Sequence, residues 1–175
     1  MKSLKKNTFD LKINTKNIRE KLLSLEQELK NIDGSFIGDS VNCPLKHSFT
    51  DGIYVREIFI PKGTVLTGKI HKHEHPNFLM SGEVLVVTEE KGEEYLKAPL
   101  SIISKAGTKR ALYAISSVVW VTIHNNPTNT RDLNELEKII IAKDYDEYAK
   151  HIDNSNSFVF KLKNLLIKKL SKCLG

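Results

Sequence analysis

Three histidines at alternate positions are the residues best suited to chemistry in this chain of 175 residues. His71, His73 and His75 are separated by single residues, so half of the six histidines fall within five positions. In an extended strand, side chains two positions apart point to the same face of the sheet. The three imidazoles, followed by Asn77, would then line one side, where neutral imidazoles could bind a metal ion. A polar, solvent-facing strand is the alternative, and we favour the metal site.

Several kinds of chemistry are open to such a cluster. Three imidazoles that leave a coordination position free could hold Zn²⁺ and activate water, or hold Fe²⁺, Mn²⁺ or Ni²⁺ for oxygen or isomerase chemistry. Arg110 and Lys109 could clamp a carboxylate or phosphate, although an ion pair at a surface or interface is the favoured interpretation of Arg110. No Ser-His-Asp or Cys-His arrangement has supporting context. Whether the protein is an enzyme therefore stays open.

The elements that must position these residues are strands. From Ile53 to His124, short runs rich in β-branched and aromatic residues are separated by Gly and Pro turns. One expected strand, from Thr64 to His75, carries the histidines. Helices do not alternate with the strands, as a parallel sheet would require. The pattern therefore predicts a mainly β fold, either a sandwich or a barrel.

Helices are expected on both sides of the β region. Residues 15 to 33 carry a heptad stripe, which comprises Ile18, Leu22, Leu25, Leu29 and Ile32. Packing on the domain and pairing with a second copy are about equally favoured for this helix. Further helices are expected from Thr130 or Asp132 and from Asp144. Residues 153 to 157 are predicted to be a polar linker.

Charge is concentrated at the ends of the chain. The net charge is +6, and residues 158 to 175 contain five lysines and no acid. They predict a basic amphipathic C-terminal helix, which could contact protein, an anionic membrane or nucleic acid, or pack as an ordinary terminal helix. No apolar region follows the basic N-terminus, and no run approaches the ~18 apolar residues of a membrane span. We therefore expect a protein made and kept in a cytoplasm.

Two motifs in the β region resemble those of a known superfamily. His71-Lys72-His73 looks like a His-x-His pair, Gly82 looks like the glycine that closes the same motif, and His75 stands where a glutamate ligand is usual. Residues 99 to 110 match the spacing of the second motif. Together they resemble the cupins, which implies a jelly-roll barrel. Arg110 takes the place of the last histidine ligand and cannot bind a metal. His124, which ends the hydrophobic strand expected from Val118, becomes the fourth candidate ligand.

A narrower resemblance rests on four segments, residues 55–64, 68–75, 105–110 and 119–124. As a set they are similar to small cupin-like proteins encoded by tailed bacteriophages, over roughly residues 45 to 148. This resemblance implies a viral setting, in the host cytoplasm or the virion, and no defined reaction. The cupin resemblance also implies a homo-oligomer, most simply a dimer.

These observations predict four regions. Residues 1–44 contain the amphipathic helix, 45–125 the cupin-like β-barrel, 126–152 a helical extension, and 153–175 the linker and basic helix. Two functions follow. The first is a divalent metal site in the barrel formed by His71, His73, His75 and His124, with a small molecule bound near Asn77 and Arg110. The second is a non-catalytic structural or interaction protein of a virion or phage, which uses the barrel as scaffold and the terminal helices for assembly.

Overall fold

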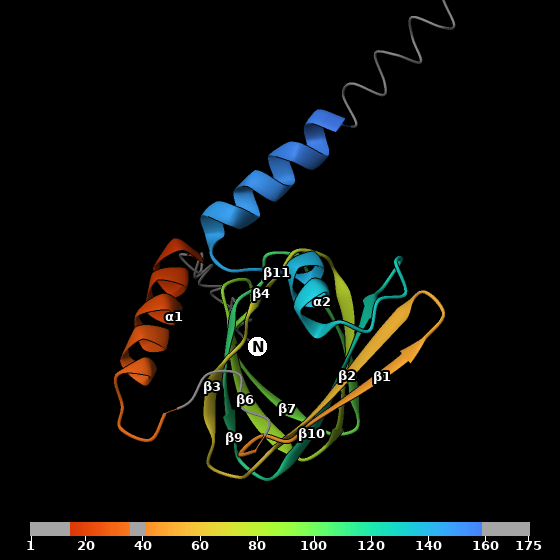
Figure 1. Cartoon of the computed structure of the whole chain (residues 1–175). Coiled ribbons are helices and arrows are strands. Elements are labelled where there is room, and N and C mark those ends of the chain that lie inside the picture. The colour runs from red at the N-terminus through yellow and green to blue at the C-terminus, as the bar shows by residue number, and fades with distance from the viewer. Residues whose placement is uncertain (1–14, 36–40, 159–175) are drawn as a thin grey trace, which may run out of the picture.

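The computed structural model describes residues 15–35 and 41–158, where antiparallel β-strands are more extensive than helices (Figure 1). One sheet has the order β1 (Leu45–Thr50), β2 (Ile53–Ile60), β10 (Val118–Asn125), β5 (His75–Ser81) and β8 (Leu100–Ser104). A second has the order β3 (Val65–Thr67), β9 (Arg110–Ala114), β6 (Glu83–Thr88) and β7 (Gly92–Lys97). A short third sheet pairs β11 (Ile141–Ala142) with β4 (Ile70–His71). The predicted mainly β class is confirmed.

Alternating side chains form the barrel interior. On β10, Val118, Trp120, Thr122 and His124 are buried, and the residues between them point outward. The main core joins both large sheets, since it contains Leu79 of β5, Trp120 and Val118 of β10, and Val84 and Leu112 of the second sheet. This period of two gives each strand one apolar face and one outer face. At the end of β10 the inward position is taken by a histidine.

The strand that the sequence predicts from Thr64 to His75 is wrong as one continuous element. β3 ends at Thr67, β4 covers only Ile70 and His71, and β5 begins at His75. The chain bends at Lys72 and His73, where the Lys72 amide donates to the Ile140 carbonyl oxygen at 2.7 Å. Pairing of β4 with β11 therefore interrupts the strand.

Helix α1 (Thr15–Lys30) packs on the barrel beside β3, as Figure 1 shows. Leu22 of its apolar stripe is only 3% exposed, although Ile32, beyond the helix, is 57% exposed. Glu26 binds Lys109 at 2.8 Å, and Arg19 binds Glu89 at 2.7 Å. Of the two alternatives for this helix, the structure shows packing on the domain.

Helix α2 (Leu133–Ile140) lies over one end of the barrel (Figure 1). Asp132 caps it, as expected, by accepting a hydrogen bond from the Asn134 amide at 2.8 Å. Leu136 and Ile140 pack with Tyr54 in a second core. This end of the barrel is the end at which β4 stops and β5 begins.

A further helix runs from residue 145 to 158, where the described part of the chain ends. The polar linker predicted at residues 153–157 is therefore wrong, because these residues are helical. The predicted basic helix that follows lies outside the described residues. Within residues 15–35 and 41–158, none of the helices has the length and apolar character needed to cross a membrane.

Candidate metal centre

Three of the four predicted histidine ligands meet inside the barrel end. One ring nitrogen each of His71, His75 and His124 lies within 4.8 Å of the other two. The ring centroids are 4.2 Å apart for His71 and His75, 4.7 Å for His75 and His124, and 5.1 Å for His71 and His124. These separations are small enough for minor side-chain rotations to bring three nitrogens to one ion. We call this group the histidine cluster.

Each member of the histidine cluster comes from a different strand. His71 ends β4, which pairs with β11, and His75 begins β5. His124 lies at the inward position near the end of β10. β5 and β10 are neighbours in the five-stranded sheet, whereas His71 reaches the cluster across the bend at residues 72 to 74. The site therefore depends on the short third sheet.

Burial keeps the cluster neutral. Burial lowers the pKa of His71 to about 2, and smaller contributions in the same direction come from His75, His124, Arg110 and Arg56. Burial likewise lowers the pKa of His124 to about 3, with smaller contributions from His75, Arg56 and His73. Burial also lowers the pKa of His75. Because metal ions bind the unprotonated imidazole, His71 and His124 stay in the ligand form well below neutral pH, and the lowered pKa of His75 acts in the same direction.

His75 has its proton on the nitrogen that points away from the cluster. Its Nδ1 lies 3.1 Å from the His73 carbonyl oxygen, and a carbonyl oxygen can only accept. Nδ1 therefore carries the proton, and Nε2 carries the lone pair. Nε2 is buried and has no hydrogen-bond partner. A hydrogen bond of this type from the second ring nitrogen is the usual way in which proteins orient a metal-binding histidine.

His73, the fourth predicted ligand, lies outside the cluster. The bend before β5 turns its ring outward, where it packs edge-on against His151 with the centroids 5.1 Å apart. Its side chain is exposed. Only its carbonyl oxygen serves the cluster, through the hydrogen bond to His75.

Asn77 forms part of the wall beside the cluster. It is 1% exposed, and its Nδ2 donates to the Ser104 hydroxyl at 2.8 Å and to the His75 carbonyl oxygen at 3.2 Å. Its Oδ1 accepts a hydrogen bond from Trp120 Nε1 at 3.0 Å. These bonds use both ends of the amide within the core. Asn77 thus supports the strand that carries His75.

Arg110 enters the barrel interior from β9. Its guanidinium donates a hydrogen bond to Ser104 Oγ and lies 5.6 Å from the centroid of the Trp120 ring. Burial lowers the pKa of Arg110 to about 10, so that it is charged at neutral pH. Its charge also lowers the pKa values of His71 and His75, which places it beside the histidine cluster.

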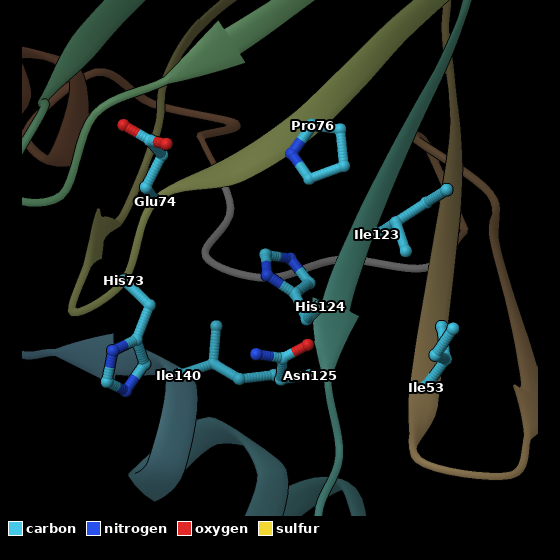
Figure 2. A pocket seen from close by; sticks show the side chains of 8 residues that line it. All are labelled: Ile53, His73, Glu74, Pro76, Ile123, His124, Asn125 and Ile140. Carbon is cyan, nitrogen blue, oxygen red and sulfur yellow. The ribbon is translucent and has the colours of Figure 1, made fainter.

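A cavity of about 160 Å³ borders the cluster from outside. Figure 2 shows His124 between the turn that carries His73 and the ends of β10 and β2, with Ile140 of α2 below. His124 itself is 7% exposed. The cavity therefore reaches the histidine cluster at His124.

Sequence reasoning missed two residues near the cluster, Tyr54 and Arg56, both on β2. Tyr54 stacks on His124 with the centroids 6.0 Å apart, and its hydroxyl lies 2.7 Å from His47 Nδ1. Arg56 lowers the pKa values of His71 and His124. The alternation of β2 was a usable signal, because Tyr54, Arg56 and Ile58 share one face.

Comparisons with known proteins concern the fold. No family model matches the chain, and no curated protein matches it significantly. Among similar solved structures, ectoine synthase from P. lautus has 15% identity and a TM-score of 0.47, over 64% of this chain and 83% of that one. An RmlC-like cupin family protein from Methanocaldococcus jannaschii has 14% identity and a TM-score of 0.42, over 57% and 92%. A cupin superfamily protein from Desulfitobacterium hafniense has 9% identity and a TM-score of 0.42, over 51% and 83%.

Proposed function

We propose that the protein binds a divalent transition metal ion at His71, His75 and His124, and binds a small molecule beside that ion. The observation that carries the proposal is the meeting of three neutral imidazoles around the buried, unpartnered Nε2 of His75. A buried polar nitrogen without a partner is costly, and a metal ion would satisfy it.

The donor set suits zinc, iron, manganese or nickel, which all accept imidazole nitrogen. Three protein ligands leave room for water or a substrate, as in catalytic zinc sites. When bound, such an ion would supply Lewis acidity to a ligand in the barrel. The protein's own residues hold the site in place: His73 orients His75 through its carbonyl oxygen, and Tyr54 stacks on His124.

Metal analysis of the purified full-length chain by plasma mass spectrometry tests the proposal. We expect near one metal ion per chain, and loss of that ion in the double variant His71→Ala, His75→Ala with the fold retained by circular dichroism. His73→Ala is the matched control, since it also removes an imidazole but lies outside the cluster; it should keep the metal. Equal metal content in the wild type and the double variant would overturn the assignment.

The alternative, a non-catalytic assembly protein, draws on one observation: an arginine, not a ligand, points into the barrel at position 110. A dimer and a bacteriophage setting also stay predictions. A solution mass that matches a large assembly, together with no metal after reconstitution, would favour this alternative over the metal site.

A further inference from the structure

Arg110 is held in a defined position inside the barrel. The Ser104 hydroxyl accepts a hydrogen bond from its guanidinium, and the Trp120 ring lies under it. Gly68 permits this placement, because a Cβ there would lie 3.1 Å from Arg110 Cγ. Three different strands or turns therefore contribute to the position of one charged group. A charged side chain held in this way is preorganised to bind a ligand of opposite charge.

No carboxylate neutralises this charge within the described part of the chain. Arg110 belongs to none of the ion pairs formed there, and neither does Arg56, the second arginine near the cluster. The neighbouring Lys109, which is 3% exposed, shows the contrast, since Glu26 pairs with it at 2.8 Å. Charged groups withdrawn from water are normally paired. Within the described residues, Arg110 and Arg56 thus carry positive charges that no direct ion pair offsets.

Free space adjoins the guanidinium. A cavity of about 50 Å³ is bordered by Arg110, Ser104, Thr88 and Ile102. Two carboxylates also line it, and each is paired with a lysine of the same lining, Glu90 with Lys105 and Glu94 with Lys91. A water molecule occupies about 30 Å³ in the liquid, so this space has room for a small polar head group.

We propose that Arg110 is the anchor of a carboxylate subsite beside the histidine cluster, so that the small molecule bound by this protein is an organic acid. This inference rests on the proposed function, because it places the acid next to the metal ion. The planar guanidinium matches a carboxylate through two parallel hydrogen bonds. Phosphate can also accept two hydrogen bonds from a guanidinium, so the titration must compare the two anions. Arg56 adds positive potential from β2.

The single tryptophan of the chain makes the test direct. Because Trp120 lies under Arg110, its fluorescence should report an anion that binds there. Full-length protein, metal-loaded and chelator-treated, is titrated at constant ionic strength with propionate, with its uncharged isostere propionamide, and with inorganic phosphate. We expect a saturable change with propionate, and none with propionamide.

Variants connect the signal to the guanidinium. Arg110→Gln should weaken propionate binding at least about tenfold, and Arg110→Lys should weaken it less, because the charge remains and the fork is lost. Lys62→Gln, which removes one exposed charge from a residue that does not line the cavity, should bind as the wild type does. The wild-type comparison of propionate with propionamide needs no variant, so it decides the question even if Arg110→Gln does not fold.

Three results would overturn the inference: equal binding of propionate and propionamide, wild-type affinity in a folded Arg110→Gln variant, or tighter binding of phosphate than of propionate. The metal content of Arg110→Gln separates this inference from the proposed function. Wild-type metal with lost propionate binding supports both. Wild-type metal with unchanged propionate binding rejects the subsite alone, and absence of metal from the wild-type protein rejects the metal centre.

Discussion

Acidification of the metal-free protein should destabilise it through the histidine cluster. His71 and His124 have folded-state pKa values of about 2 and about 3, below the ordinary value of 6.5. At pH values between the folded-state pKa values and 6.5, these two histidines are protonated in the unfolded chain and neutral in the folded chain. The free energy of unfolding is therefore largest above pH 6.5 and falls as the pH decreases through 6.5 toward the folded-state values.

The size of the effect follows from the same pKa values. From about pH 7.5 to about pH 5, a histidine that titrates only when unfolded costs about 2 kcal/mol of stability, since each pH unit below 6.5 is worth about 1.4 kcal/mol. The two residues together cost about 4 kcal/mol, a large part of the ~5–15 kcal/mol that stabilises a typical domain. His75 acts in the same direction, because burial lowers its pKa as well.

Urea unfolding in the presence of a chelator measures this dependence. His71→Asn or His124→Asn should each reduce the loss between the two pH values by about 2 kcal/mol, because one titrating group is gone. His73→Asn should change it much less, since the His73 side chain is exposed. If the wild type and the His71→Asn and His124→Asn variants all lost the same stability, the reasoning about a buried, neutral cluster would be refuted.

Three further outcomes are expected. Asn77→Ala should lower the free energy of unfolding by about 2–4 kcal/mol in urea titrations, because it leaves the Trp120 indole N–H unpaired in the core. Gly82→Ala should cost about 3 kcal/mol or more, since φ is +88° and a Cβ would lie 2.3 Å from the Ser117 carbonyl oxygen; thermal melting measures it. Propionate and zinc should each tighten the binding of the other by the same factor, which competition with a zinc-binding dye can measure.

The sequence predicts the candidate ligands better than the way in which they are held. The 71, 73, 75 alternation indicated a ligand cluster, and two of those histidines do meet. Their common face on one strand was wrong, because β4 pairs with β11, some seventy residues later in the chain. That pairing and the hydrogen bond from the Lys72 amide to Ile140 bend the chain at His73. A local pattern cannot reveal a bend imposed by so distant a segment.

His124 joins the cluster because of its position along β10 and because of the strand next to β10. The sequence indicates only the first of these. The alternation from Val118 to His124 predicts that His124 and Trp120 share a face. It does not predict which strands lie next to β10, and that arrangement brings His124 to His75. Helix α1 shows a similar limit: the stripe around Leu22 predicts an apolar contact, but only the fold shows that the contact is with β3.

The charges around the cluster explain why an arginine at position 110 is compatible with a metal site. Three neutral imidazoles add no negative charge to offset a divalent ion, and Arg110 and Arg56 increase the positive potential. Like charges repel strongly in a poorly solvated interior. An anion bound between the ion and Arg110 would offset this repulsion. The same arginine that opposes metal binding in the empty barrel would therefore favour it once a carboxylate is present.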